Sequence, residues 1–201
     1  TLNGPPELSV GDVSQAEGTD TTTAFDVSVS LSSQPLPGET VTVEVVTFEN
    51  NGAESGSDFT DIGTITLSFP EAGPLVQTVT VNVNADNIFE DDETFGVRIQ
   101  NNTATSAIAD AEATITITND DALPTIDIAD ASGDEGTATN NTLSFALSLS
   151  NPSEQVITVT ADTGVVSQIG TGGDDFTPNN EQITFQPGQT ERVFDVQTIA
   201  D

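Results

Sequence analysis

The sequence concentrates acidic side chains in one short stretch, Asp86-Asn87-Ile88-Phe89-Glu90-Asp91-Asp92-Glu93, which holds five carboxylates in eight residues. Neighbouring carboxylates repel one another by about 1 kcal/mol per pair in water, and more strongly where water is partly excluded. We therefore expect a cation to bind here. Carboxylate oxygens in this number suit Ca²⁺, which takes about six to eight oxygen ligands, better than metals that prefer nitrogen and sulfur. The stretch predicts a calcium-binding structural domain.

The charge balance of the chain excludes several classes of partner. Asp and Glu number 33 against two basic residues, Arg98 and Arg192, so the formal net charge is -31. Nucleic acid is excluded as a partner because neutralising phosphates requires a basic surface. An anionic membrane would repel the chain as well, and no apolar run is long enough to span a bilayer, so we expect no membrane insertion.

The residue types that most catalytic sites need are missing. The chain has no His and no Cys, which excludes Ser-His-Asp and Cys-His catalysis, zinc sites of the usual kind and disulfides. Paired carboxylates can cleave glycosides, but the chain also lacks the Trp and Tyr that usually line sugar-cleaving clefts. We therefore predict that the chain is not an enzyme.

Composition also bears on where the protein works. A cysteine-free, acidic chain rich in Thr, Ser, Asn and Gly is typical of exported bacterial proteins, so we expect an extracellular or cell-surface location. Thr1 does not begin a signal peptide, and we expect the sequence to be a slice of a longer protein.

Apolar residues alternate with polar ones along most of the chain, which indicates strands with one buried and one solvated face. Before Asp121 we count seven such strands, separated by short turns rich in Gly and Pro, and no window has a helical pattern. These features predict an all-β fold, an immunoglobulin-like Greek-key β-sandwich. The seven windows lie at residues 8–13, 25–31, 41–45, 62–69, 79–83, 95–99 and 113–118.

The sequence then repeats itself, which predicts two tandem domains. The stretch Val10 to Gly18 is similar to Ile128 to Gly136. Likewise, Gly56-Ser57-Asp58-Phe59-Thr60 is similar to Gly173-Asp174-Asp175-Phe176-Thr177. We place the first domain at residues 1–121 and the second at residues 122–201.

The second copy is incomplete, because Asp201 is the counterpart of Asp86 and nothing matches residues 87–121, which supply the last two predicted strands. A sandwich without them would expose a sheet edge and part of its core. Three explanations are open: a longer parent chain, a shortened chain, or a strand donated by a neighbour.

Several motifs together resemble the Calx-β domain family. They are Glu17-Gly18 after the first strand, Gly56-Ser57-Asp58-Phe59, the acidic run continued by Thr94-Phe95, and Asn119-Asp120-Asp121. That family includes calcium-sensing domains of sodium-calcium exchangers, a module in integrin β4, and tandem arrays in bacterial surface proteins. The resemblance covers nearly the whole chain, and the string Asp-x-Ile-Phe-Glu-x-Asp-Glu-x-Phe is its most specific part.

The resemblance implies calcium ligands at one end of each sandwich. In the first copy they are the carboxylates of Glu17, Asp58, Asp86, Glu90, Glu93, Asp120 and Asp121 and the backbone carbonyl of Ile88. In the second copy the matching acids are Glu135, Asp175 and Asp201, with Asp174 as an extra candidate, and this site is expected to be partial and weaker.

Alternatives to this ligand set remain open. Calcium sensors that resemble this domain have three consecutive acids where this chain has Ala85-Asp86-Asn87, so we expect one or two ions and weaker binding. Asp91 and Asp92 are interpreted as solvated charge, Glu17 has the alternative role of ending a strand, and diffuse sodium is an alternative to bound calcium.

Three functions are compatible with the sequence. In the first, the domains are spacers of a large bacterial surface protein, adhesin-like or filament-like, in which Ca²⁺ rigidifies the junction between neighbouring repeats. The short linker Asn119 to Pro124 favours this function. In the second, exposed loops such as Glu49 to Gly56 or Asn101 to Asp110 recognise a surface glycan or protein. In the third, the domain is a calcium-sensing regulator. The isolated chain is expected to be monomeric, with neighbouring repeats as its partners.

Overall fold

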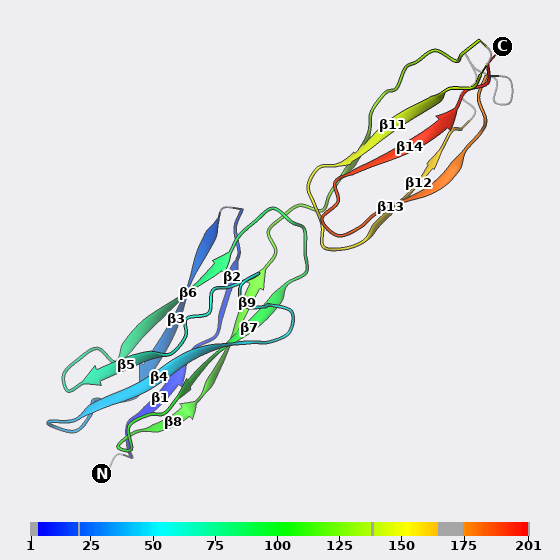
Figure 1. Cartoon of the computed structure of the whole chain (residues 1–201). Helices are drawn as coiled ribbons and strands as arrows, with labels where there is room; N and C mark the ends of the chain where they lie inside the picture. The colour runs from blue at the N-terminus through cyan, green and yellow to red at the C-terminus, as the bar shows by residue number, and fades with distance from the viewer. Residues whose placement is uncertain (1–3, 20, 138, 165–174, 201) are drawn as a thin grey trace. The chain divides into compact units, whose positions relative to one another are not determined.

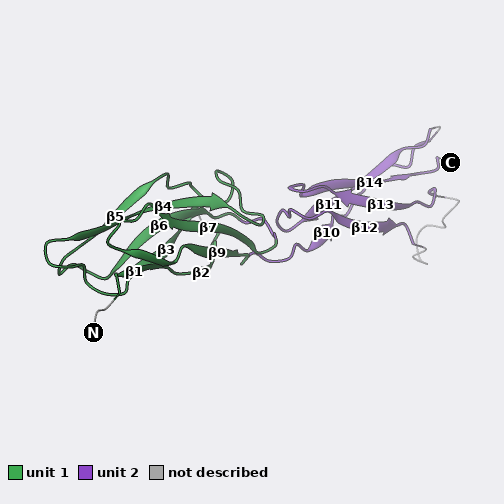
Figure 2. Ribbon diagram, turned by 90° about the horizontal axis from the view of Figure 1, so that it is seen from below, with its two compact units in different colours: residues 1–86, 91–120 green, residues 87–90, 121–201 purple. Residues whose placement is uncertain are grey.

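The computed structural model describes residues 4–19, 21–137, 139–164 and 175–200, and these ranges form strands and loops without a helix. Within them, no helix is long and apolar enough to cross a membrane. The chain divides into two compact units, residues 1–86 with 91–120 and residues 87–90 with 121–201, coloured separately in Figure 2.

The first unit is a sandwich of two sheets built from nine strands (Figure 1). One sheet has the order β6-β3-β1-β8, and the other has the order β2-β9-β7-β4-β5. The strands are β1 (Glu7–Val10), β2 (Val13–Ala16), β3 (Thr22–Leu31), β4 (Thr40–Glu49), β5 (Ile65–Pro70), β6 (Val76–Asn84), β7 (Glu93–Gln100), β8 (Ala107–Asp110) and β9 (Glu112–Thr118).

The first unit has two strands more than the seven that the sequence predicted. The window at residues 8–13 is not one strand, because β1 pairs with β3 in one sheet whereas β2 pairs in parallel with β9 in the other. The chain crosses between the sheets at Gly11, whose amide donates to the carbonyl of Ser28 at 3.0 Å. The short strand β8 was not predicted; it pairs in parallel with β1.

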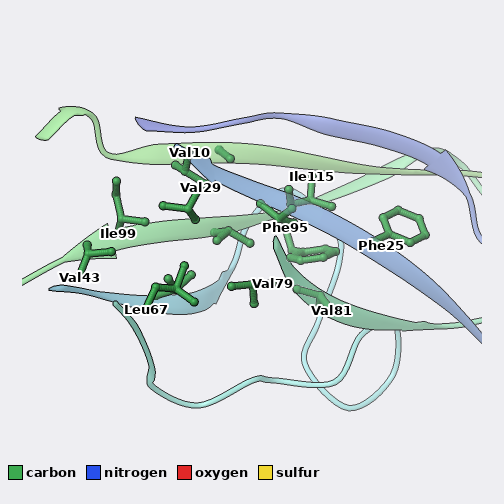
Figure 3. Close-up of a cluster of buried hydrophobic side chains, with 14 of the residues drawn as sticks. Val10, Phe25, Val29, Val43, Leu67, Val79, Val81, Phe95, Ile99 and Ile115 are labelled. Atoms are coloured by element: carbon green, nitrogen blue, oxygen red, sulfur yellow. The ribbon is translucent and has the colours of Figure 1, made fainter. Parts of the chain in front are cut away.

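Alternating burial holds the two sheets of the first unit together. Along β3, Phe25, Val27 and Val29 are fully buried while the residues between them are exposed. The same alternation along β4, β6, β7 and β9 fills the space between the sheets, and Figure 3 shows Val29, Val43 and Ile99 within this core. Burying each such side chain contributes about 1.5–3 kcal/mol relative to exposure, so the apolar faces fix the strand register.

The second unit repeats half of this plan, with three strands in one sheet and two in the other. The sheets have the orders β10-β11-β14 and β12-β13, which correspond to β1-β3-β6 and β4-β5 of the first unit. The strands are β10 (Ile126–Ile128), β11 (Thr142–Leu149), β12 (Ile157–Asp162), β13 (Asn180–Phe185) and β14 (Glu191–Gln197).

The residues at the end of β6 and β14 show the same correspondence in detail. Phe59 forms an antiparallel bridge with Val83, and Phe176 forms the same bridge with Thr198. Among the described strands of the second unit there is no counterpart of β7, β8 or β9.

Candidate calcium site

The predicted acidic ligands of the first unit gather at one end of its sandwich because of strand direction. Glu17 directly follows β2, Asp120 lies two residues after β9, and β2 and β9 run parallel with Ala16 opposite Thr118. Glu93 opens β7, opposite Ile117 of β9. These three strand ends therefore lie at the same end of one sheet.

The other sheet brings Asp86 to this end. Asp86 follows β6 by two residues, and the amide of the preceding Ala85 donates to the carbonyl of Thr21, directly before β3. Asp58 reaches the same end from the loop between β4 and β5, where its carbonyl accepts a 2.8 Å hydrogen bond from the Asn84 amide. Five of the predicted ligands thus share one end of the first unit.

Glu17 is the buried member of this group, with only 3% of its surface exposed. Among the described residues it is the one charged side chain that is buried. Its carbonyl accepts a hydrogen bond from the Thr23 hydroxyl, and its amide donates to the Thr118 carbonyl at 3.3 Å. Burying a carboxylate in a chain of net charge -31 costs free energy unless positive charge or hydrogen bonds compensate it.

Two of the other carboxylates accept hydrogen bonds from nearby backbone. Asp120 Oδ1 accepts from the amide of Gly18 at 3.1 Å, and Asp58 Oδ2 accepts from the amide of Glu54 at 2.7 Å and the hydroxyl of Ser57 at 3.0 Å. These bonds hold the turn after β2 and the loop after β4 in place.

The loop after β4 also packs against the side chain of Glu93. A Cβ atom added at Gly52 would lie 3.0 Å from Glu93 Oε1, and the amide of Thr94 donates to the Asn51 carbonyl at 3.2 Å. Gly52 has a φ of 102°, a conformation that glycine adopts without strain. The sequence reasoning missed Gly52, although its position beside Asn51 in an Asn-Gly pair is a turn signal.

Asp92 has a structural role that the sequence reasoning also missed. Its Oδ1 accepts a 3.0 Å hydrogen bond from the amide of Asn119, which joins the start of β7 to the residue that follows β9. Its interpretation as merely solvated charge was incomplete.

Three predicted ligands of the first copy belong to the second unit instead. Ile88 and Glu90 lie in the segment Asn87–Glu90, and Asp121 begins the main part of that unit. Within the segment, the Phe89 amide donates to the Pro152 carbonyl and the Phe89 carbonyl accepts from the Glu154 amide, both at 3.0 Å. The predicted ligand set is therefore divided between the two units.

In the second unit, Glu135 and Asp175 line one cavity together with Thr198. The Thr198 hydroxyl donates to the Glu135 carbonyl at 2.9 Å, and the Ile199 amide donates to the Asp175 carbonyl at 2.9 Å. Glu135 is exposed, unlike its counterpart Glu17. The predicted ligand Asp201 and the extra candidate Asp174 lie outside the described residues.

These residues suit a calcium ion by their chemistry and by the end of the sandwich that they share. Their carboxylates are not gathered around one point, since no three acidic side chains within the described ranges are grouped closely enough to hold a metal ion. Binding would therefore require these side chains to move closer together.

The model of the Calx-beta domain family matches residues 10–121 and 153–201, which is most of the sequence. The chain belongs to the Calx-beta domain family. This confirms the resemblance inferred from the motifs, and the described strands confirm the predicted all-β, immunoglobulin-like sandwich.

Solved Calx-beta structures share this fold. The apo form of the Calx CBD1 domain is 27% identical, with a TM-score of 0.51, covering 58% of this chain and 99% of that one. The CBD12 structure of CALX1.2 is 20% identical, with a TM-score of 0.51, covering 96% and 76%. The CBD12 of CALX1.1, described as a calcium binding domain, is 21% identical, with a TM-score of 0.50, covering 94% and 74%. No curated protein sequence matches significantly.

Proposed function

We propose that this chain is a pair of calcium-binding Calx-beta repeats with a structural and not a catalytic function. The observation that carries the proposal is the burial of Glu17 at the end of the first unit where four other predicted acidic ligands lie. A divalent cation would offset the repulsion among these groups and the cost of burying one of them.

The proposed ligands are those predicted from the sequence. In the first unit Glu17, Asp58, Asp86, Glu93 and Asp120 would supply carboxylate oxygens. Glu90, Asp121 and the carbonyl of Ile88 are the remaining predicted ligands. Bound Ca²⁺ would contribute a positive charge shared among these oxygens, with no change in oxidation state. The likeness to a calcium binding domain of CALX1.1 motivates the choice of ion.

The finer proposal is a spacer in a large extracellular bacterial surface protein. Tandem repeats, the absence of cysteine and the net charge of -31 support it. The short linker supports a stiff connection, because Asp120 and Asp121 are predicted ligands and Pro124 restricts the backbone soon after them. On this proposal, calcium restricts the angles that neighbouring repeats can adopt.

A regulatory calcium sensor is the second candidate, favoured by the 27% identity to a Calx CBD1 domain. The two functions differ in what calcium should do. A sensor should change shape strongly at the micromolar or lower concentrations typical of cytosolic signalling, whereas a spacer should be loaded and constant at millimolar extracellular calcium.

Small-angle scattering and thermal unfolding of residues 1–201 test the proposal. Calcium at about 100 times its dissociation constant should stabilise the binding unit by about 2.7 kcal/mol, raising its melting temperature by roughly 10 °C or more. It should also narrow the distribution of maximum dimensions, and EDTA should reverse both effects. Equal concentrations of Mg²⁺ serve as the control, because Mg²⁺ demands a smaller octahedral site. Identical curves in calcium and in EDTA would refute the calcium-dependent spacer.

A further inference from the structure

The first unit has an Asn-Gly pair in the tight turn that follows β4. Asn50 forms an antiparallel bridge with Ala53, so Asn51 and Gly52 are the two central residues of this turn. Their φ values are 27° and 102°, both positive, as in the hairpin turns that favour Asn-Gly. Asn51 and Gly52 are both exposed. The pair is therefore open to water at the surface of the first unit.

An exposed Asn-Gly pair has the chemistry needed for spontaneous deamidation. The backbone nitrogen of Gly52 attacks the side-chain carbonyl carbon of Asn51, which forms a cyclic succinimide and releases the amide nitrogen as ammonia. Water then opens the ring. Opening at the side-chain carbonyl gives aspartate, and opening at the backbone carbonyl gives isoaspartate, in which the main chain runs through the former side chain. Neither step oxidises or reduces the protein, and glycine hinders ring closure least because it has no Cβ.

The packing of Glu93 explains why glycine is required after Asn51. A Cβ atom added at Gly52 would lie 3.0 Å from Glu93 Oε1 and 3.2 Å from Glu93 Cδ. The φ of 102° would also strain any residue other than glycine. At Asn51 the positive φ favours asparagine, aspartate or glycine. The turn that packs against Glu93 therefore requires a residue pair that is chemically reactive.

Other asparagines in the described ranges are less suited to this reaction. Asn82 precedes a valine within β6, and its bulky neighbour hinders ring closure. The side-chain nitrogen of Asn102 donates to the Ser106 carbonyl at 2.8 Å, which restrains the amide. The other Asn-Gly pair in the sequence begins at Asn3, which lies outside the described residues. Within the described ranges, Asn51 is thus the favoured position.

We propose that Asn51 is a site of spontaneous deamidation that modifies the loop after β4. The aspartate product fits the same turn, since aspartate tolerates a left-handed conformation. The isoaspartate product adds one main-chain carbon between Asn50 and Ala53, which the bridge between these residues does not accommodate. It also displaces the carbonyl at position 51, which accepts the 3.2 Å hydrogen bond from the Thr94 amide. Isoaspartate formation therefore loosens the contact between this loop and β7, and either product adds one negative charge beside Glu93.

Ageing of the chain of residues 1–201 at mildly alkaline pH, followed by peptide mapping with mass spectrometry, tests the proposal. Position 51 should convert to a mixture of isoaspartate and aspartate, while Asn50 and Asn82 in the same digest remain amides. A synthetic peptide of residues 47–56 gives the rate without the folded turn. The folded chain should convert no more than about tenfold more slowly than this peptide, because exposed turns open at little free-energy cost.

Two substitutions separate the cause of the reaction from its effect. Gly52→Ala should abolish most of the conversion, and the same substitution in the peptide gives this result independently of folding. Asn51→Asp reproduces the aspartate product, and it should melt within about 3 °C of the unmodified chain because it is an exposed substitution that the turn tolerates. In the isolated isoaspartate fraction, hydrogen exchange at the Thr94 amide should be at least about tenfold faster than in the Asn51→Asp chain.

Several outcomes would overturn the proposal. Conversion of the peptide without conversion of the folded chain would show that the turn protects Asn51. Equal conversion at Asn50 or Asn82, or equal rates for the Gly52→Ala and unmodified peptides, would contradict the role of the Asn-Gly pair. Unchanged exchange at the Thr94 amide in the isoaspartate fraction would contradict the loosened loop.

Discussion

The backbone amide of Gly18 donates a hydrogen bond to Oδ1 of Asp120 at 3.1 Å. This bond joins the turn after β2 to the segment after β9, at the end of the first unit where Glu17 is buried. Gly18 has a φ of 84°, which lies in the left-handed region that favours glycine. The Glu-Gly pair therefore places an acidic side chain in the interior and turns the backbone toward a second acid.

Replacing Gly18 by alanine tests this turn. The alanine would have to keep a left-handed backbone conformation, and its Cβ would lie 3.0 Å from the Thr23 hydroxyl oxygen. We expect Gly18→Ala to destabilise the first unit by about 1–2 kcal/mol in urea unfolding. Gly4→Ala is the matched control, since nothing lies within 4 Å of its Cβ position and its φ is not positive. Equal stability of the two variants would contradict the strained turn.

The stacked rings of Phe59 and Phe95 are expected to dominate the stability of the first unit. Both rings are at most 1% exposed, so truncating one leaves a cavity in a closely packed core. Phe95→Ala should lower the free energy of unfolding by about 3–5 kcal/mol, measured by calorimetry or denaturant titration. Val76→Ala, at a side chain that is 56% exposed, should change it by less than about 0.5 kcal/mol. A small effect of Phe95→Ala would show that the core relaxes around the loss.

The titration of Asp61 tests a hydrogen-bonded carboxylate that is not one of the predicted ligands. The Thr47 hydroxyl at 2.6 Å, followed by the Gly63 amide at 2.9 Å, lowers the pKa of Asp61 below its usual value. Because the folded-state pKa is the lower one, its stabilisation is present above the unfolded pKa of about 4 and is lost as pH falls through the folded pKa.

Thr47→Val should raise the pKa of Asp61 toward the ordinary aspartate value, as read from carboxylate carbon shifts in an NMR titration. Asp162 provides the internal control, since its lowered pKa depends on Asn180 and Gly164 and should not move. Conversely, Asn180→Ala should raise the pKa of Asp162 alone. A Thr47→Val variant whose Asp61 titrates unchanged would contradict the assigned cause.

Much of the fold could be predicted from alternation, because each strand of the first unit has one buried face. Phe25, Val27 and Val29 identified β3, and Phe95 and Val97 identified β7. The crossing between sheets at Gly11 could not be predicted this way, since one apolar pattern runs through β1 and β2 while their partners differ. The parallel pairing of β8 with β1 depends on a contact distant in sequence.

The candidate site was predictable only in part. Strand direction alone places Glu17 and Asp86 at one end, because antiparallel and parallel pairings fix where strands finish. Two features depend on loop packing, which leaves no periodic pattern in the sequence. They are the near-complete burial of Glu17 and the hydrogen bond that the Glu54 amide donates to the Asp58 carboxylate. The assignment of Ile88 to the second unit likewise follows from contacts made by its neighbour Phe89.

Calcium titration calorimetry of residues 1–201 tests the central claim most directly. The unmodified chain should take up one or two Ca²⁺ ions saturably, and Glu17→Gln should weaken the tightest site at least tenfold because it removes one charged ligand and little volume. Glu39→Gln, the same change in the turn before β4 at the opposite end of the first unit, should bind calcium like the unmodified chain. Absence of saturable heat, or equal affinities for the Glu17→Gln and Glu39→Gln variants, would contradict calcium binding at the buried glutamate.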